Sequence, residues 1–373
     1  MCMKILYVTT ISGTMPFFEG IIKELIKDGN TVDIACGDTK SQYCDTFRKL
    51  NCKIYELDTS RNPLNFNTIR SIGLIKEIVK NGKYDVVHCH TPIISVCTRI
   101  ACKAYRKKGL KVIYTAHGFH FFKGASIKNW ILYFPIEWLC SFWTDILITI
   151  NKEDFRRAKR ILHAKRTLYV PGVGIDLDDF GESCNGDYIR EEFNIPENAT
   201  LLLSVGDLNK NKNHKAVVKA ISYLNIDNLY YIIVGSGDNN ELNSVIEELE
   251  LQNRVKLAGY RDDVRNIMKA ANFYVHPSFR EGLSVSIMEA MASGLPCAVS
   301  RIRGNVDLIN EYGGVLFEPS DLQDITDKLY SIIMSREIYK KMGIYNQEKA
   351  KKYDKKNINK KMFKIYHSID RNN

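Results

Sequence analysis

Residues 273–300 read FYVHPSFREGLSVSIMEAMASGLPCAVS, and this stretch decides the fold. An apolar strand candidate at Phe273–His276 leads into a polar loop, a helix begins near Ser284, and a second strand candidate follows at Pro296–Ser300. A strand, a helix and a further strand in this order are typical of a parallel β-α-β unit. Because the first N–H groups of a helix lack intrahelical acceptors and lie at its positive dipole end, the stretch also predicts an anion site at the helix start.

Short apolar strands alternate with helix-length amphipathic segments along almost the whole chain. The strand candidates are Lys4–Thr10, Thr31–Cys36, Asp85–His90, Lys111–His117, Asp145–Ile150, Thr167–Val170, Thr200–Gly206, Leu229–Gly235, Arg254–Ala258, Phe273–His276 and Pro296–Ser300. Helical spacing covers Phe17–Asp28, Thr68–Asn81, Ile93–Lys107 and Asn151–Leu162. Buried strands rich in Val and Ile that alternate with helices predict an α/β protein whose parallel sheets are covered on both faces.

The strands fall into two series separated near Pro171–Gly174. We therefore expect two Rossmann-like domains, 1–172 and 173–351, that face one interdomain cleft. From Tyr339 to Ile369, apolar residues alternate with lysines, which favours amphipathic helices packed on the body of the protein. We expect the final helix, 352–373, to pack back on the first domain.

The composition is that of an ordinary globular protein, with 45% hydrophobic and 26% charged residues. The ten cysteines are scattered without a CxxC pair, and several lie in apolar runs where a free thiol behaves as a small hydrophobe. The start, Met1–Thr10, resembles a first β-strand rather than an export signal. These features predict a protein of a reducing compartment, the cytoplasm.

The net charge of +10 is distributed unevenly. Residues 1–170 hold 27 Lys and Arg against 14 Asp and Glu, a net charge of +13, so the remaining residues carry −3. A basic front half indicates an anionic partner, and phospholipid head groups, a polyprenyl diphosphate and nucleic acid all qualify. A solvated lysine-rich surface explains the same charge equally well.

Membrane contact is a further expectation for the front half. The most apolar window, Trp130–Ile150, contains a proline and two acidic residues, so it is not expected to span a bilayer. Aromatic residues near basic ones in and before this window favour a contact at the membrane interface. Phe121 and Phe122 are the best candidates for that contact, whereas a buried aromatic helix is the favoured interpretation for most of the other aromatic residues.

Two carboxylates flank the predicted helix start. Glu281 lies just outside the helix and Glu289 about two turns inside it, and Gly282 lets a phosphate approach the backbone closely. Carboxylates so placed can bracket an extended ligand and accept hydrogen bonds from its hydroxyls. On spacing alone, a capping role for Glu281 and a solvated position for Glu289 are equally compatible with the sequence.

Glu281 and Glu289, with seven residues between them, resemble the E-x7-E motif of the family 4 retaining glycosyltransferases, which have the GT-B fold of two Rossmann-like domains. The residues around both glutamates also match that family, and the resemblance covers nearly the whole chain. It implies that Glu281 contacts the hydroxyls of the donor sugar and Glu289 the nucleotide ribose. It implies further that the amides of Leu283 and Ser284 bind the diphosphate.

A second match follows the first strand of the back domain, at Ser204–His214. A strand that ends in glycine, followed by a loop with a lysine at a helix start, forms a sensible phosphate clamp. The family usually reads G-R-L-x-x-x-K-G/N here, so Lys212 resembles its diphosphate-binding lysine. Asp207 stands where the family commonly has arginine, which removes one expected phosphate contact, and Lys210 is a candidate to replace it.

In the front domain, Thr115–Gly118 ends a strand, where residues lining the cleft of a parallel sheet are expected. A structural role would be the better interpretation of His117 taken alone. By the resemblance, His117 occupies the context of the family's front-domain histidine near the donor sugar, which implies a catalytic or sugar-positioning role. The segment Ser12–Thr14 resembles the family's first loop, which implies a donor contact at Gly13, although the double glycine common there is missing.

Weaker signals surround these motifs. Tyr260 and Arg261 follow a back-domain strand and are candidates for holding the nucleotide base. Asp176–Asp178 has the form of a DxD metal motif, but it resembles the family's interdomain segment, so no metal site is expected. His88 and His90 flank Cys89 on a strand whose immediate neighbours face opposite sides, and without a further ligand pair they are expected to line or support the cleft.

The resemblance implies a hexose or N-acetylhexosamine transferase that uses a nucleotide diphosphate sugar, with UDP-sugars suggested, without metal or cofactor. The basic front half fits a polyprenyl-diphosphate-linked saccharide acceptor at the inner face of the cell membrane, as in capsule, exopolysaccharide or O-antigen assembly. One alternative is a nucleotide-sugar epimerase of the same architecture. Another is a non-enzymatic nucleic-acid-binding protein, which the lack of a recognisable binding module disfavours.

Overall fold

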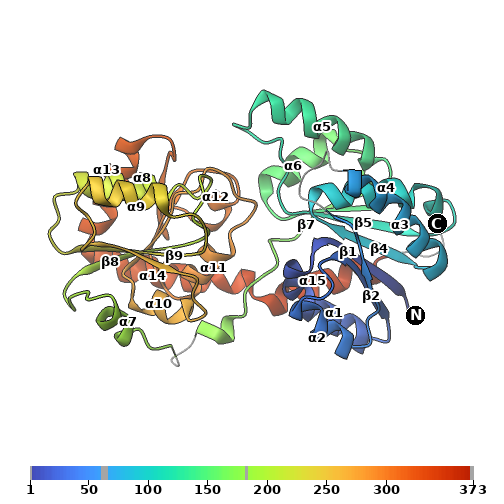
Figure 1. Ribbon diagram of the computed structural model, residues 1–373, viewed down its shortest axis with the longest axis horizontal. Helices are drawn as coiled ribbons and strands as arrows, with labels where there is room; N and C mark the ends of the chain where they lie inside the picture. Colours follow the sequence, from blue (N-terminus) through green and yellow to red (C-terminus); the bar gives the residue numbers. More distant parts are fainter. Residues whose placement is uncertain (1, 60–65, 181–183, 370–373) are drawn as a thin grey trace. The chain divides into compact units, whose positions relative to one another are not determined.

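The computed structural model describes residues 2–59, 66–180 and 184–369. The chain divides into two compact units, of which unit 1 comprises Met1–Val173 and Lys356–Asn373 and unit 2 comprises Gly174–Lys355. Each unit is an α/β structure built on one parallel sheet, coloured by sequence in Figure 1. All ten cysteines are free thiols, and most of them are buried.

Unit 1 contains a seven-stranded parallel sheet in the order β3-β2-β1-β4-β5-β6-β7. Its strands are β1 (Lys4–Ile11), β2 (Thr31–Gly37), β3 (Ile54–Glu56), β4 (Val86–His90), β5 (Lys111–Ala116), β6 (Ile146–Thr149) and β7 (Arg166–Tyr169). Every residue of β4 and β6 is buried, because helices cover both faces of the sheet. The chain order reverses between β1 and β4, which makes that point the expected ligand site of this sheet.

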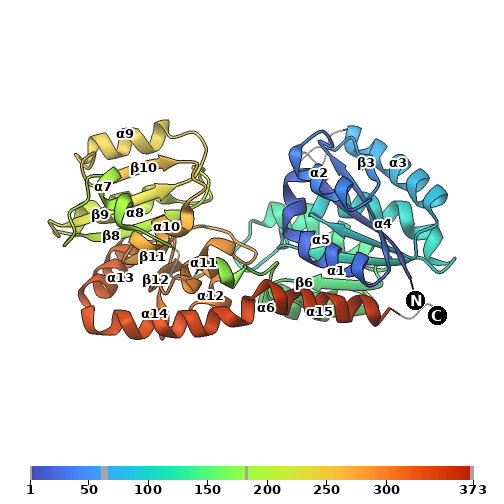
Figure 2. The same cartoon turned by 90° about the horizontal axis from the view of Figure 1, so that it is seen from below.

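Helices cover the two faces of the unit 1 sheet as separate groups (Figure 1). On one face lie the 3-10 helix η1 (Ser12–Phe18), α1 (Glu19–Lys27), α2 (Gln42–Lys49) and α15 (Lys355–His367). On the other lie α3 (Phe66–Gly82), α4 (Pro92–Arg106), α5 (Ile127–Ser141) and α6 (Lys152–Ile161). The helix that ends the chain therefore completes the unit that begins it, and Figure 2 shows α15 beside α1 and β6.

Unit 2 contains a six-stranded parallel sheet in the order β10-β9-β8-β11-β12-β13, with its reversal between β8 and β11. Its strands are β8 (Thr200–Val205), β9 (Leu229–Val234), β10 (Val255–Gly259), β11 (Phe273–His276), β12 (Cys297–Ser300) and β13 (Gly314–Phe317). Its helices are η2 (Leu177–Phe180), α7 (Asp187–Glu192), α8 (His214–Tyr223), α9 (Asn240–Glu248), α10 (Val264–Ala270), α11 (Val285–Ala292), α12 (Asn305–Leu308), α13 (Leu322–Met334), α14 (Arg336–Ala350) and η3 (Lys351–Tyr353). The expected pair of Rossmann-like sheets is confirmed.

Two short strands and one surface position differ from the sequence-based expectation. The pattern did not predict β3 and β13, which have three and four residues and lie at sheet edges, where no long apolar run is needed. The prediction that Phe121 contacts a membrane is wrong, because Phe121 is fully buried and stacks on Phe119 beneath α5. Among the described residues, no helix combines the length and apolar character needed to cross a membrane.

Candidate functional site

Two loops meet where the chain order of the unit 2 sheet reverses. Asn211 donates its side-chain N–H to the Arg280 carbonyl at 3.0 Å, and its own carbonyl accepts from the Phe279 amide at 2.8 Å. Asn213 donates to the Pro277 carbonyl at 3.2 Å. The loop after β8 is thereby fixed against the loop after β11, which joins the two motifs that the sequence singled out.

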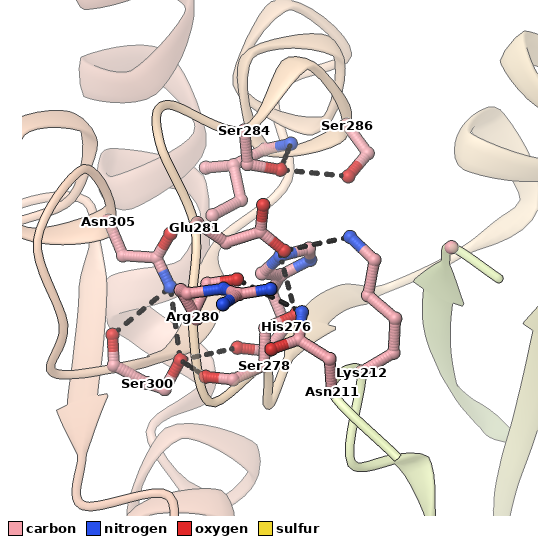
Figure 3. A network of polar contacts seen from close by, with 12 residues as sticks. Asn211, Lys212, His276, Ser278, Arg280, Glu281, Ser284, Ser286, Ser300 and Asn305 are labelled. Atoms are coloured by element: carbon pink, nitrogen blue, oxygen red, sulfur yellow. Dashed lines mark hydrogen bonds and ion pairs between the residues drawn. The ribbon is translucent and has the colours of Figure 1, made fainter. Parts of the chain in front are cut away.

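An ion pair lies at the centre of this junction (Figure 3). Lys212 Nζ donates to Glu281 Oε1 at 2.7 Å, and the two side chains are 20% and 15% exposed. His276 Nε2 lies 3.0 Å from the same carboxylate oxygen, and Tyr274 Oη lies 3.3 Å from His276 Nδ1. Because an ionised carboxylate only accepts, this contact favours the His276 tautomer with its proton on Nε2.

The partners of Glu281 keep it ionised. Burial alone would raise the pKa of Glu281, but the hydrogen bond from His276 and the charge of Lys212 outweigh burial and lower the pKa to about 2. Burial also lowers the pKa of His276 below its usual value, so His276 is neutral near pH 7 and acts as a hydrogen-bond donor. The positive charge that offsets the carboxylate is therefore that of Lys212.

The loop that carries Glu281 is supported by the last residue of β12 and by the loop that follows it. Arg303 donates Nε–H to the Glu281 carbonyl at 3.2 Å, and Ser300 Oγ donates to the Ser278 carbonyl at 2.6 Å. Gly304 has φ +80°, and a Cβ there would lie 2.3 Å from the Gly282 carbonyl oxygen. Only glycine fits at position 304 without displacing the loop.

The predicted anion site is present at the start of α11. Ser284 caps the helix, accepting from the Ile287 amide at 3.4 Å, and Leu283 and Ser284 are both buried. Within the described ranges, no acceptor is found for the amides of Leu283 and Ser284. Two unsatisfied N–H groups at a helix start, close in sequence to an ion pair, are suited to an anionic ligand.

Glu289 lies on α11 in a different environment from that of Glu281. Burial raises the pKa of Glu289 to about 7, although the charge of Arg265 acts in the opposite direction. Arg265 is itself paired with Asp179 and lies over the ring of Phe180, both from the end of η2. Glu289 is thus a carboxyl group poised to change its charge near neutral pH.

The weaker candidates in unit 2 have varied surroundings. Asp207 and Lys210 are exposed in the loop after β8, and Lys210 lines a cavity of about 620 Å³. Tyr260 is exposed after β10. Arg261 is held by two carboxylates, with its Nε 2.8 Å from Asp263 and its Nη2 2.9 Å from Glu192. To bind a nucleotide base, Arg261 would therefore have to give up its ion pairs with Asp263 and Glu192.

In unit 1, His117 joins a cluster of histidines at the ends of β4 and β5. His88 and His90 face the same side of β4, with ring centroids 4.1 Å apart, and His90 Nδ1 lies 3.3 Å from His117 Nε2. Burial lowers the pKa of His117 to about 4, so all three rings are neutral near pH 7. His90 Nε2 is buried, and the described part of the chain offers it no hydrogen-bond partner.

A cavity of about 320 Å³ lies at the reversal point between β1 and β4. Its walls are Thr10, Ile11, Thr14, Thr91, Pro92, Ile93, His120 and Tyr133. The rings of His120 and Tyr133 stack at 4.4 Å, and Thr91, at φ +69°, bonds to Thr10 through the two hydroxyls at 2.6 Å. A β-branched residue at positive φ is strained, and such strain clusters at functional sites. Gly13 lies in η1, beside the cavity residue Thr14.

Sequence reasoning missed several of these residues. His276 ends a buried strand one residue before the matched loop, so its position at the carboxyl edge of a parallel sheet was the available signal. The strain at Thr91 and the pairing of His120 with Tyr133 leave no such signal, because they depend on backbone angles and packing. Among the described residues, no group of three or more His, Cys, Asp or Glu side chains could hold a metal ion.

Known protein families match both units of the chain. The family model described as glycosyl transferase 4-like matches residues 4–151, and the model described as glycosyl transferases group 1 matches residues 186–349. Over 379 residues the chain is 30% identical to the protein assigned as glycosyltransferase EpsD of Bacillus subtilis, covering 98% of this chain and 97% of that one.

Two further relatives share the sequence or the fold. The UDP-Gal:α-D-GlcNAc-diphosphoundecaprenol α-1,3-galactosyltransferase of Escherichia coli is 32% identical over 285 residues, 70% of this chain and 72% of its own. The crystal structure of Anabaena HepE in complex with UDP and glucose superposes with a TM-score of 0.80 at 18% identity, covering 98% of this chain and all of that one. The chain belongs to the group 1, or family 4, glycosyltransferases and has their GT-B fold.

Proposed function

We propose that this glycosyltransferase moves a hexose or N-acetylhexosamine from a UDP-sugar to a lipid-linked saccharide, with retention of the anomeric configuration and without a bound metal. The observation that carries the donor part is the contact of Lys212 with Glu281 beside the unsatisfied amides of Leu283 and Ser284. A cation and helix-start amides together stabilise the negative charge that develops on a departing diphosphate.

In this proposal, Glu281 accepts hydrogen bonds from the donor sugar and Glu289 from the ribose. The low pKa of Glu281 keeps it an acceptor at every physiological pH. Lys212 is shared, so that its ammonium turns from the carboxylate to the diphosphate when the donor binds. Asp207 is exposed and brings a negative charge to the same loop, where Lys212 and the exposed Lys210 are the two cations available to the diphosphate.

The donor and acceptor classes are supported by the relatives. The E. coli relative is named for UDP-galactose and for an acceptor on undecaprenyl diphosphate, and HepE was crystallised with UDP. The α-linkage in the relative's name, formed from an α-linked UDP-sugar, corresponds to retention. With no enzymic nucleophile assigned, we propose that the acceptor hydroxyl attacks on the face that the diphosphate leaves and that the departing phosphate oxygen takes its proton. His117 would position the transferred sugar.

The first experiment is a thermal-shift screen against UDP, GDP, ADP, CMP and dTDP, with and without magnesium. Stabilisation follows RT ln(1 + [L]/Kd), so a nucleotide present at 100 times its Kd raises the free energy of unfolding by about 2.7 kcal/mol. We expect a shift with UDP that magnesium does not change. No shift with any nucleotide would contradict the donor assignment.

Variants then test the two central residues. Charge-assisted hydrogen bonds contribute about 1.5–3 kcal/mol, so Lys212→Ala should weaken UDP binding by roughly 10- to 100-fold. The matched control is Lys219→Ala, which removes an exposed lysine of α8 in the same unit. Glu281→Ala should abolish sugar transfer while unit 2 stays folded. Normal sugar transfer by Glu281→Ala would contradict the role proposed for Glu281. Turnover of a free UDP-sugar without an acceptor would instead favour an epimerase.

A further inference from the structure

One helix of unit 1 leaves an apolar face uncovered. Seven large apolar side chains of α5 and its C-cap are exposed: Ile127, Ile131, Leu132, Ile136, Trp138, Leu139 and Phe142. Ile127 is 77% and Ile131 71% exposed. Single exposed apolar residues are common on soluble proteins, but a continuous apolar helix face marks an interaction surface. We call these seven residues the apolar face of α5.

The opposite side of α5 is firmly packed, so the exposed face is not the result of a loosely attached helix. Glu137, the single acidic residue of α5, is buried and paired with Arg99 of α4 at 2.9 Å. Phe121 packs edge-on against Trp130 and Phe134. The helix is therefore anchored through one side, and its single carboxylate is removed from the surface.

Cations lie near both ends of the apolar face. Lys128 is exposed on α5 itself, and Lys103 of α4 lies over the ring of Trp143, just after the helix, at 4.3 Å. On α6, Lys159 and Arg160 are exposed in the last turn. His163, three residues after Arg160, stacks on Phe142 at 4.3 Å, which places the end of α6 beside the end of α5. Figure 1 shows α4, α5 and α6 together over one face of the sheet.

We propose that the apolar face of α5 docks on an anionic lipid bilayer, with its side chains among the acyl boundary and the cations of α4, α5 and α6 at the headgroups. Apolar residues, two of them aromatic, flanked by Lys and Arg are the pattern that binds in the plane of a membrane interface. A second protein chain with a matching apolar surface would not require these cations, whereas anionic lipid does.

The test is co-sedimentation with vesicles of phosphatidylglycerol and phosphatidylcholine in equal parts, compared with vesicles of phosphatidylcholine alone. The variant combines Ile131→Ser with Leu139→Ser. Its control combines Ile344→Ser with Met334→Ser, which removes two exposed apolar residues of unit 2 helices; Ile344 is 67% exposed. Because all four side chains are exposed, neither variant disturbs the core.

We expect the wild-type protein and the control to bind the anionic vesicles, and the α5 variant to bind about tenfold more weakly or worse. Binding should fall in 0.5 M salt and on the neutral vesicles. Equal binding by the α5 variant and the control would overturn the proposal. So would a change in oligomeric state of the α5 variant with unchanged vesicle binding, which would make the face an interface between copies of the chain.

The UDP thermal shift, measured on the same samples, separates the two proposals. A wild-type protein that binds UDP but not vesicles would overturn the docking surface and leave the donor assignment standing. A protein that binds vesicles through α5 but shows no nucleotide shift would support the docking surface and contradict the proposed function.

Discussion

At the scale of single residues, two carboxyl groups near one helix start have pKa values shifted in opposite directions. The pKa of Glu281 is about 2 and that of Glu289 about 7. Both are largely buried, so the difference comes from their partners: Glu281 has Lys212 and His276 at hydrogen-bond distance, whereas Glu289 feels the charge of Arg265, which that of Asp179 opposes. Environments that separate two similar groups in this way assign them different chemical roles.

The raised pKa of Glu289 has a measurable effect on stability. Its folded value of about 7 lies above the ordinary 4.5, so its contribution is fully present below pH 4.5 and is lost as the pH rises through 7. Glu289→Gln has no such loss. Measured by urea unfolding, the free energy of unfolding of the variant relative to wild type should rise by about 2 kcal/mol between pH 5 and pH 8. Parallel pH profiles of the two proteins would contradict a raised pKa.

The sequence indicated part of this arrangement. Glu281 and Lys212 were both singled out, because a carboxylate beside a glycine at a helix start and a lysine in a loop before a helix start match the pattern of the family that the chain resembles. Their direct contact was not predicted, since it depends on Asn211 and Asn213 fixing the two loops together. The support from Arg303 likewise depends on packing between separate loops, and the contact of His276, five residues before Glu281, depends on how the loop after β11 turns back on its strand.

At the scale of elements, the loop between β11 and α11 depends on a close backbone approach. Gly304→Ala would place a methyl group 2.3 Å from the Gly282 carbonyl oxygen at a φ of +80°, so the loop that carries Glu281 must shift. We expect a loss of about 1–3 kcal/mol of stability and weaker nucleotide binding. The checks are urea unfolding and titration with UDP.

The matched control is Gly73→Ala in α3, where an added Cβ meets nothing within 4 Å. Replacing a helical glycine of this kind should stabilise the protein by about 0.5–1 kcal/mol. A Gly304→Ala protein as stable as wild type, with unchanged UDP affinity, would show that the close approach does not constrain the loop.

Helices and strands with a clear sequence pattern of apolar residues or caps were predicted, and elements without such a pattern were not. The start of α11 near Ser284 follows from its cap and the apolar run behind it. The edge strands β3 and β13 are too short for a pattern. For Phe119, Phe121 and Phe122, the sequence shows aromatic residues beside a lysine but not their orientation. The fold buries Phe119 and Phe121 beneath α5 and exposes the side chains of α5 itself.

At the scale of the whole molecule, unit 1 depends on the last helix of the chain. Ile358, Met362, Ile365 and Tyr366 of α15 are buried in its core, and Tyr366 donates to Tyr7 at 2.6 Å. Ile365→Ala should destabilise unit 1 by about 2–4 kcal/mol, because it leaves a cavity in packed apolar surface. Lys361→Ala, on the exposed side of α15, should change stability by less than about 0.5 kcal/mol.

Hydrogen exchange separates the effect on the two units. We expect Ile365→Ala to lower protection throughout the β1-β2-β4 region of unit 1 and to leave the strands of unit 2 unchanged. Uniform loss of protection in both units would show that they unfold together, and an unaffected unit 1 would mean that α15 is not part of its core.

The two parallel sheets were predictable because alternation of strand and helix is a repeated, whole-chain signal. The return of α15 to unit 1 follows a weaker pattern of alternating apolar residues and lysines in the tail, which says that the helix packs but not against which residues. The core contacts of Tyr366 with Tyr7 and His88 join positions at opposite ends of the sequence.

That return sets the order in which the protein can be made. Unit 2 is continuous in sequence, so it can fold as soon as residue 355 has left the ribosome, whereas the core of the first 173 residues is completed only when α15 follows. At about 5–20 residues per second, the wait lasts roughly 10–40 s. During that time the sheet face that α15 covers is partly bare, and a product of translation truncated before α15 leaves that face incomplete.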